Sequence, residues 1–184
     1  LCDCTGYRLD GTDTEPNMYV GIIINRSLAD TTDSVTGLGD IHALVNAIGE
    51  MRRVAREAGF IAIKVDDIAE VNARFGFDAG DRVLAESAAC LMDCSRGKGR
   101  LFRSTGPTFV ALFDELGPEA IDEIASEIER FLGSPVLIGS LEYQPPIRVA
   151  TLHLDGVDRQ PVSILNELKA RLIEAPQVPG TKLD

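Results

Sequence analysis

Residues 60–84, FIAIKVDDIAEVNARFGFDAGDRVL, pass from an apolar run through an acidic pair into helical sequence. The run Phe60–Val65 predicts a buried strand, because its first four residues, Phe60 to Ile63, are apolar and so is Val65. This strand ends at Asp66-Asp67, and a short helix is expected over Ile68–Phe75. Gly76 is placed to end that helix in the left-handed conformation.

Two further features bring acidic side chains and a glycine-containing turn near this strand end. Asp78 is expected to cap the next helix, with Asp81 in its first turn, where the helix dipole favours a carboxylate. Strands over Arg100–Arg103 and Phe109–Phe113, with a turn at Thr105–Pro107, predict a hairpin. Carboxylates at a strand end facing such a hairpin suit a site for phosphate and metal.

Apolar periodicity predicts the other elements. Helices are expected over 41–58, 83–94, 118–132 and 161–175, strands over 18–25 and 147–154, and a short hairpin over 135–143. Gly59 is expected to stop the first helix, and the chain after Pro176 is expected to be a loose tail. This order of elements predicts an α+β fold, in which helices pack on a sheet.

Composition and charge limit the function classes. The chain has 184 residues, enough for one full domain and a fragment, and 45% of them are hydrophobic. The net charge of −11 argues against a broad nucleic-acid surface and against binding to acidic lipids. No apolar run reaches the length of a membrane span, so we expect no membrane segment in this part of the protein and a cytoplasmic location.

The cysteines and histidines give no metal-site pattern. The four cysteines, at positions 2, 4, 90 and 94, lack the spacing of a zinc module and are expected to be free or buried thiols. His42 and His153 have no recognisable set of partners along the sequence and are expected to be structural.

At the positions described above, the sequence resembles the GGDEF family, the diguanylate cyclases. The family pattern D-x-D-x-F-K-x-I-N-D, followed by G-H-x-x-G-D, lies without a gap on Lys64–Ala73 and Gly76–Asp81. The signature R-x-G-G-D-E-F lies on Arg103–Phe109, and the family's opening motif D-x-L-T-G-L lies on Asp33–Leu38. The resemblance covers residues 33–175 and implies the ferredoxin-like sheet of nucleotide cyclases, with the hairpin across its centre.

The resemblance also implies a metal site, and its ligand positions are changed in this sequence. Joining two GTP molecules into cyclic di-GMP depends on a divalent metal that holds the phosphates. The metal-binding positions carry Lys64 and Pro107, which bring no carboxylate, and the second acidic position is Thr108. Asp66 lies on the same strand face as Lys64 and is expected to pair with it. We therefore expect no catalytic residue, no metal and no cofactor. Magnesium would be bound only if the domain is an active cyclase with an unusual metal site.

The positions that contact the nucleotide in the family are partly retained. The guanine-reading positions carry Asn72 and Asp81, whose oxygens can accept hydrogen bonds from guanine. Lys64 can pair directly with a phosphate, whereas the family's phosphate-contacting lysine is Ala69 here. The alternative for each guanine position is structural: Asn72 on a solvated helix, and Asp81 at a helix start.

The family's inhibitory site for cyclic di-GMP, R-x-x-D, falls on residues 96–99. Arg96 is retained and the aspartate is replaced by Gly99, so this basic turn is either a weakened phosphate contact or a solvated loop. Near the C-terminus, a further lysine of the family is replaced by Pro176.

The resemblance implies three parts of the chain. Residues 1–27 form a flank whose strand resembles the last strand of a PAS sensor domain, or pairs locally or with a second copy of the chain. Residues 28–175 are a degenerate GGDEF domain, and 176–184 are a tail or linker.

The function expected from this reading is regulatory. The domain would lack cyclase activity and act as a regulatory or dimerising module beside sensor and EAL-like output domains in a cyclic di-GMP signalling protein. The alternatives are a sensor that binds GTP or cyclic di-GMP without turnover, and a working cyclase with an unusual metal site.

Overall fold

A computed structural model describes residues 3–8, 19–24, 31–54, 57–95, 97–132, 134–156 and 158–181. The chain divides into two compact units, residues 1–31 and residues 32–184. None of the helices in these described ranges combines the length and the apolar character that crossing a membrane requires.

The first unit contains an antiparallel hairpin. Strands β1 (Asp3–Arg8) and β2 (Tyr19–Ile24) pair in a register that joins Asp3 to Ile24 and Arg8 to Tyr19. The predicted strand over 18–25 is therefore found in the part of it that the structure describes, and it pairs locally. Its partner β1 was not predicted, because DCTGYR lacks the apolar alternation on which strand prediction depends.

The second unit is a sheet with helices on both faces. Its elements are α1 (Ile41–Val54), β3 (Glu57–Val65), α2 (Ile68–Phe75), α3 (Phe77–Ser95), β4 (Arg100–Arg103), β5 (Thr108–Asp114), α4 (Pro118–Leu132), β6 (Val136–Ile138), β7 (Leu141–Tyr143), β8 (Ile147–Asp155), α5 (Pro161–Glu174) and β9 (Gln177–Val178). The five strands of the main sheet have the order β4-β5-β3-β8-β9, and each neighbouring pair is antiparallel. Strands β6 and β7 form a separate short hairpin. The α+β prediction is confirmed.

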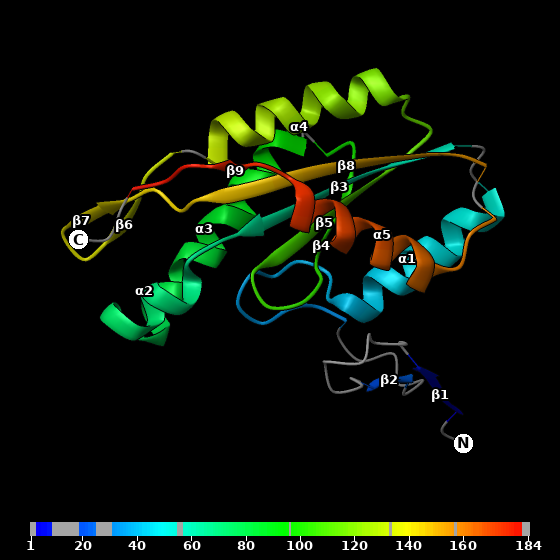
Figure 1. Cartoon of the computed structure of the whole chain (residues 1–184), viewed down its shortest axis with the longest axis horizontal. Helices are drawn as coiled ribbons and strands as arrows, with labels where there is room; N and C mark the ends of the chain where they lie inside the picture. The colour runs from blue at the N-terminus through cyan, green and yellow to red at the C-terminus, as the bar shows by residue number, and fades with distance from the viewer. Residues whose placement is uncertain are drawn as a thin grey trace. The chain divides into compact units, whose positions relative to one another are not determined.

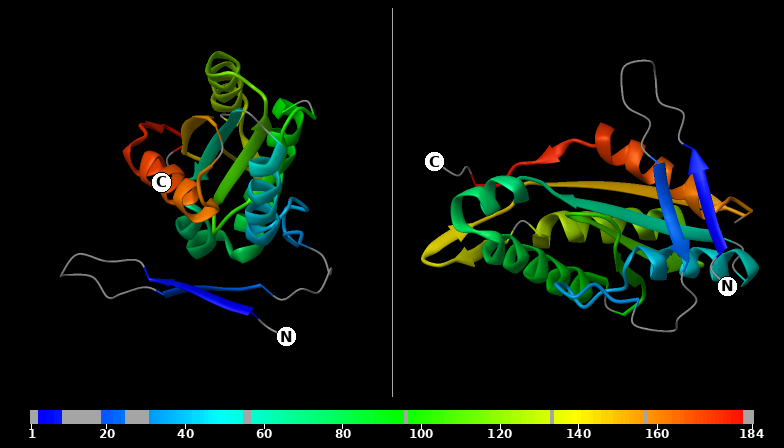
Figure 2. Two further views of the ribbon diagram at one scale, coloured as in Figure 1. Left: turned by 90° about the vertical axis from the view of Figure 1, so that its right-hand side faces the viewer. Right: turned by 90° about the horizontal axis from the view of Figure 1, so that it is seen from below.

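The central strand β3 separates two hydrophobic cores. Ile61, Ile63 and Val65 lie in a buried cluster with side chains of α3 and α4. Phe60 and Ala62, at the alternate positions, lie in a second cluster with side chains of α1 and α5. Figure 1 shows α4 along one face of the sheet and α1 with α5 along the other. The views in Figure 2 agree with this three-layer arrangement, in which every side chain from Phe60 to Ile63 is buried.

The helix and strand boundaries differ from the predictions at one glycine. Helix α1 ends at Val54, and Ala58 and Gly59 already belong to β3, so Gly59 does not stop the helix. A Cβ atom on Gly59 would lie 2.2 Å from Cδ1 of Ile121 on α4. Glycine at this position therefore permits the close approach of helix to sheet, a role that sequence spacing does not distinguish from a helix stop.

The join between α2 and α3 also differs from the prediction. Gly76 has φ 86° and ψ 166°, so it has a positive φ but is not in the left-handed helical conformation. Helix α3 begins at the next residue, which places Asp78 inside its first turn instead of at the cap. Asp81 consequently lies beyond the first turn. Gly76 is the one residue between the two helices, so no separate residue is available to cap α3.

Two expectations about the sheet were wrong. The hairpin of β4 and β5 lies at one side of the sheet, with β4 as the edge strand, and the centre is β3 between β5 and β8. The chain after Pro176 is not loose, because β9 pairs with β8 through Val178 opposite Ile147 and Gln177 opposite Arg148. Figure 1 shows β9 beside β8 at the end of the chain.

Candidate functional site

Three segments meet where the central strand β3 ends. The amide of Val65 donates to the carbonyl of Pro107 over 3.0 Å, which joins β3 to the turn of the β4–β5 hairpin. The amide of Asp66 donates to the carbonyl of Pro146 over 2.8 Å, which joins β3 to the start of β8. The positions singled out in the sequence, Lys64, Pro107 and Thr108, are thus brought to one place.

Lys64 lies in a row of side chains that crosses the sheet. In the strand register, it is opposite Thr108 of β5 on one side and Arg148 of β8 on the other. Its ammonium Nζ lies 2.7 Å from Oδ1 of Asp66, and its side chain is 44% exposed whereas that of Asp66 is 8% exposed. The predicted ion pair between Lys64 and Asp66 is present.

Asp66 has two further partners that were not predicted. The guanidinium Nε of Arg148 donates to Oδ2 over 2.9 Å, and the amide Nε2 of Gln177 donates to the same oxygen over 2.7 Å. Arg148 also donates from Nη1 to the carbonyl of Ala175 over 2.9 Å. We call Lys64, Asp66, Arg148 and Gln177 the Asp66 cluster. Both carboxylate oxygens of its central residue are engaged by donors of this chain.

The electrostatics of the Asp66 cluster favour an ionised carboxylate. Burial raises the pKa of Asp66, but hydrogen bonds from Lys64, Gln177 and Arg148 outweigh it and hold that pKa below its ordinary value. Magnesium binds through oxygen ligands with available lone pairs. Here the one carboxylate is already bound by an ammonium, a guanidinium and an amide, and Pro107 has no ligand atom in its side chain. These residues do not fit a magnesium ion.

The hairpin turn is closed by backbone contacts. The amide of Ser104 donates to the carbonyl of Thr108 over 2.8 Å, and the amide of Thr108 donates to the carbonyl of Thr105 over 3.0 Å. Gly106 has φ 53°, a value that glycine adopts without steric cost. The turn therefore keeps a defined shape with Pro107 and Thr108 at the family's acidic positions.

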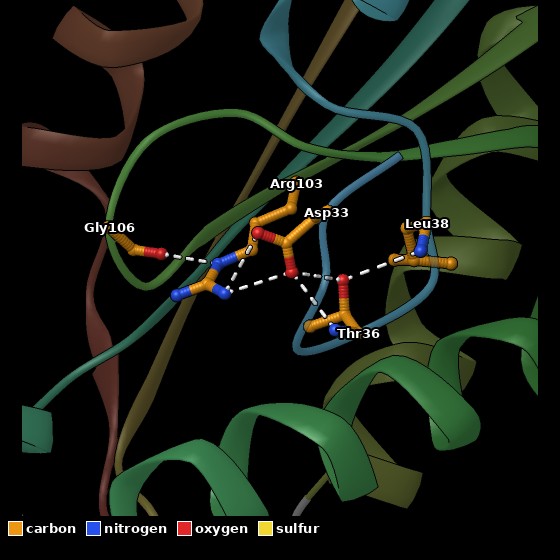
Figure 3. A network of polar contacts seen from close by, with 5 residues as sticks. All are labelled: Asp33, Thr36, Leu38, Arg103 and Gly106. Carbon is orange, nitrogen blue, oxygen red and sulfur yellow. Dashed lines mark hydrogen bonds and ion pairs between the residues drawn. The ribbon is translucent and has the colours of Figure 1, made fainter. Parts of the chain in front are cut away.

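A second cluster supports this turn from the N-terminal side (Figure 3). Arg103 donates from Nη1 to both carboxylate oxygens of Asp33, over 2.9 and 3.1 Å, and from Nε to the carbonyl of Gly106 over 2.9 Å. Thr36 donates from its amide and its hydroxyl to Oδ1 of Asp33, over 2.9 and 2.8 Å. We call Asp33, Thr36, Arg103 and Gly106 the Asp33 cluster. It joins the opening motif to the hairpin.

The pKa of Asp33 is lowered for the same physical reasons as that of Asp66. Burial raises it, but hydrogen bonds from Arg103 and Thr36 and the charge of Arg103 outweigh burial and lower the pKa. Asp33 and Arg103 both lie in motifs quoted from the sequence, but their ion pair was not predicted. The available signal was that each motif carries one charged residue, of opposite sign.

The two guanine-reading candidates lie on neighbouring helices. Asn72 of α2 faces Gly80 of α3, where an added Cβ would lie 2.0 Å from Oδ1 of Asn72. That oxygen is buried and accepts no hydrogen bond from the described residues. Asp81 is exposed on α3. Among the described residues, no hydrogen bond or ion pair joins either side chain to Lys64, so the structure does not gather the three nucleotide candidates into one set of contacts.

The position of the family's inhibitory motif is only partly described. Arg96 lies outside the described residues. Gly99 is packed against Phe113, since a Cβ atom there would lie 2.5 Å from Cε1 of the ring. The small size of Gly99 is therefore accounted for by packing.

Two groups of titratable residues lie away from this end of the sheet. Cys90 and Cys94 form no disulfide among the described residues, and burial, followed by the neighbouring Cys94, raises the pKa of Cys90 to about 12. The expectation that His153 lacks partners was wrong: its Nε2 lies 3.3 Å from Oε2 of Glu57, and its Nδ1 lies 3.6 Å from Oδ1 of Asp155. Glu57 and Asp155 are opposite each other in β3 and β8, a pairing that required the strand register.

Comparisons with known proteins identify the family of this chain. The family model described as diguanylate cyclase, GGDEF domain, matches residues 30–172. The chain is 29% identical over 113 residues to the cyclic di-GMP phosphodiesterase PdeR of Escherichia coli, covering 60% of this chain and 17% of that protein. It is 29% identical over 84 residues to the diguanylate cyclase DgcS of Shewanella oneidensis, covering 44% of this chain and 28% of that protein. The chain thus matches less than a third of each relative's length.

Solved structures show the same fold. The GGDEF domain of FimX from Pseudomonas aeruginosa superimposes with a TM-score of 0.75 at 16% identity, covering 80% of this chain and 94% of that domain. The GGDEF domain of DgcB from Caulobacter crescentus, in complex with c-di-GMP, gives a TM-score of 0.72 at 16% identity, covering 83% of this chain and 90% of that one. Because the family model matches more than half of the sequence, the chain belongs to the GGDEF diguanylate cyclase family.

Proposed function

We propose that residues 32–181 form a GGDEF domain that does not synthesise cyclic di-GMP and that regulates a larger cyclic di-GMP signalling protein. The observation that carries this proposal is the Asp66 cluster. Where the family places a metal-binding aspartate, Lys64 extends its ammonium to 2.7 Å from Asp66. The remaining carboxylate oxygen accepts from Arg148 and Gln177.

The size of the expected loss supports a silent domain. Metal stabilisation of phosphoryl transfer is worth several kcal/mol, and each ~1.4 kcal/mol corresponds to a tenfold change in rate. Replacement of both ligand carboxylates by Lys64 and Pro107 should therefore slow the reaction by roughly four orders of magnitude or more. No residue of the Asp66 cluster has a free carboxylate to replace them.

The relatives support a regulatory role within a longer protein. PdeR is a cyclic di-GMP phosphodiesterase, and the segment matched by this chain is 17% of it. A domain of the cyclase family can thus be one part of a protein named for a different activity. We propose the same arrangement here, with a sensor domain before this one, of PAS type, and an output domain of EAL type after it, in a dimeric cytoplasmic protein.

A second candidate function is nucleotide binding without turnover. The observation that favours it is the buried Oδ1 of Asn72, which accepts no hydrogen bond within the described chain. An unsatisfied buried acceptor costs free energy, and a guanine donor would relieve that cost once the Asn72 side chain turns its oxygen away from Gly80. Lys64 remains partly exposed and can contact a phosphate without metal. GTP or cyclic di-GMP would be the ligand.

Product analysis tests the first proposal, and calorimetry separates it from the second. The protein is incubated at millimolar GTP with magnesium, and cyclic di-GMP is measured by mass spectrometry. We expect no product, and turnover near that of ordinary cyclases would contradict the proposal. Titration with GTP, with and without magnesium, should give no heat for a purely structural domain and metal-independent binding for a sensor.

The matched control restores the family's acidic positions. A Lys64→Asp, Pro107→Asp, Thr108→Glu variant should remain inactive, because Ala69 and Pro176 still stand where the family has lysines. Activity in this variant, with none in the unmodified protein, would show that those three positions alone silence the domain.

A further inference from the structure

The beginning of β3 and the end of β8 place one histidine and two carboxylates side by side. Glu57 and Asp155 are opposite each other in the antiparallel register, and His153 comes two residues before Asp155. Because side chains alternate along a strand, all three lie on the same face of the sheet. That face is the one covered by α4, since Gly59, two residues after Glu57, faces Ile121 of that helix. Figure 1 shows this end of the sheet on the right, away from β9.

The potential ligand atoms of Glu57, His153 and Asp155, which we call the His153 cluster, lie close together. One ring nitrogen of His153 and one oxygen of each carboxylate are all within 4.8 Å of one another. Nε2 of His153 is 3.3 Å from Oε2 of Glu57, and Nδ1 is 3.6 Å from Oδ1 of Asp155. Ligands about 2.0–2.1 Å from a tetrahedral zinc ion are about 3.3–3.4 Å apart, so Nε2 and Oε2 have the spacing of two such ligands.

The Nε2 atom of His153 is a buried polar atom that the described chain leaves unsatisfied. It is shielded from solvent, and it makes no hydrogen bond with a described residue in spite of its contact with Glu57. Such an atom costs free energy, and an ion or a water molecule is a common explanation for it. A neutral imidazole nitrogen is a ligand that zinc prefers. A metal ion held between Nε2 and the Glu57 carboxylate would satisfy this atom.

An open hollow in the surface gives a cation access to the carboxylates. It is lined by Glu57, Glu115, Asp155 and Gly156. The amide of Glu115 donates to the carbonyl of Glu57 over 3.2 Å, which holds the backbone of a third acidic residue beside the hollow. The side chains of Glu57 and Asp155 are 38% and 92% exposed, so both can turn towards an ion without moving the core. Three carboxylates around one hollow attract a divalent cation.

We propose that the His153 cluster binds a divalent cation of the zinc type through Nε2 of His153 and the carboxylates of Glu57 and Asp155. Glu115 or a water molecule in the hollow completes the coordination. A histidine with carboxylates favours zinc over magnesium, which prefers oxygen ligands in octahedral geometry. The site is separate from the family's magnesium position, because Glu57 begins β3 and Lys64 lies roughly 23 Å further along the strand.

A metal ion in this site would join two strands at one end of the sheet. Glu57 belongs to β3, whereas His153 and Asp155 belong to β8. Because the ligands come together only when these strands pair, the ion binds the folded chain and stabilises it by mass action. The expectation of no metal was drawn from residues close together in the sequence, and these ligands become neighbours only through the register of β3 and β8. The inference does not depend on whether the domain makes cyclic di-GMP.

Nuclear magnetic resonance of the imidazole nitrogens tests the site on the full 184-residue chain after metal has been removed by chelation. The chain has two histidines, so the signals that disappear in His153→Ala identify His153. Zinc should shift the Nε2 signal of His153 and raise the Tm by about 5–10 °C at a free concentration about 100 times the Kd. Zinc that binds only to cysteines would leave the His153 signals unchanged, and that result would overturn the proposal.

Two carboxylate variants and a matched control test the ligand set. Asp155→Asn changes an exposed side chain without touching the core and should weaken zinc binding at His153 about tenfold or more. Glu57→Gln should act in the same direction. Asp158→Asn makes the same change of charge at a fully exposed side chain outside the cluster and should leave the affinity unchanged. Unchanged affinity in both carboxylate variants, or an equal loss in the control, would overturn the proposal.

Magnesium distinguishes a zinc-type site from a general attraction of cations to the hollow. At the same concentration as zinc, magnesium should neither shift the His153 signals nor displace zinc, because it gains little from an imidazole ligand. Displacement of zinc by an equal concentration of magnesium would overturn the assignment of the site to a zinc-type cation.

Discussion

The Asp33 cluster and the Asp66 cluster use the same chemistry in two settings. Each has a mostly buried aspartate whose pKa is held low by hydrogen bonds from basic side chains. The Asp33 cluster lies where the family motifs are retained, at Asp33 and Arg103. The Asp66 cluster lies where this sequence departs from the family pattern, at Lys64. The comparison teaches that the same kind of ion pair occurs both where the family motif is matched and where Lys64 departs from it.

The two clusters differ in what they hold together. Asp33 joins the opening motif to the hairpin turn through Arg103, and both segments have further backbone contacts there, including the amide of Arg103 donating to the carbonyl of Gly39 over 2.7 Å. Asp66 joins β3 to the short strand β9, which has few other contacts. Loss of the Asp66 cluster should therefore affect a more weakly supported segment.

The largest effect is expected from removing the carboxylate of Asp66. Asp66→Ala leaves Lys64 and Arg148 as adjacent cations without the carboxylate they share, and breaking a buried pair from one side is strongly destabilising. Because both cations are partly exposed, we expect about 2–3 kcal/mol of lost unfolding free energy, measured by urea denaturation. The double variant Lys64→Met, Asp66→Ala removes one unpaired cation and should recover part of that loss. A change within error of the unmodified protein would mean that the cluster does not stabilise the domain.

A double-mutant cycle on Asp33 and Arg103 should give the next largest effect. Their side chains are 22% and 15% exposed, and two N–H···O contacts join them. We expect a coupling energy of about 1–2 kcal/mol from Asp33→Ala, Arg103→Ala and the double variant in thermal or urea unfolding. Faster amide exchange in residues 104–108 should accompany each single change. Coupling near zero would show that Gly106 and Gly39 alone suffice to hold Arg103 and the turn.

The elements of the fold were predictable wherever local pattern decides them. The apolar run Phe60–Ile63, the stripe from Ile121 to Leu132 and the turn at Gly106 each specify their own conformation, and the structure has them. The role of Gly59 was not predictable, because a glycine that stops a helix and one that lets Ile121 approach a strand look alike in sequence. The spacing of residues along the sequence does not show which residue of another element packs against a given glycine.

In the candidate site too, some contacts were predictable from local pattern and others were not. The pair of Lys64 and Asp66 follows from strand alternation alone, because residues two apart share a face. Arg148 and Gln177 lie 82 and 111 residues from Asp66, so their contacts depend on which strands become neighbours in the sheet. Strand β9 has only two residues, too short to show alternation, and its partners could not be recognised before β8 was placed.

The smallest effect, and the one that treats both clusters alike, is on the pH dependence of stability. The folded-state pKa of each aspartate is below its ordinary value of 3.8, so each carboxylate contributes stability that is fully present above about pH 3.8. As pH falls from 3.8 through the lower folded-state pKa, the unfolded chain binds protons first, and that stability is lost. Asp33→Asn and Asp66→Asn should each flatten the fall in unfolding free energy over this window, and the double variant should flatten it more, measured by urea unfolding from pH 6 to the acid limit of reversibility. If only Asp66→Asn changes the slope of unfolding free energy against pH, then Arg103 and Thr36 do not favour the ionised form of Asp33 over the protonated one. The two clusters would then share their geometry but not their electrostatics.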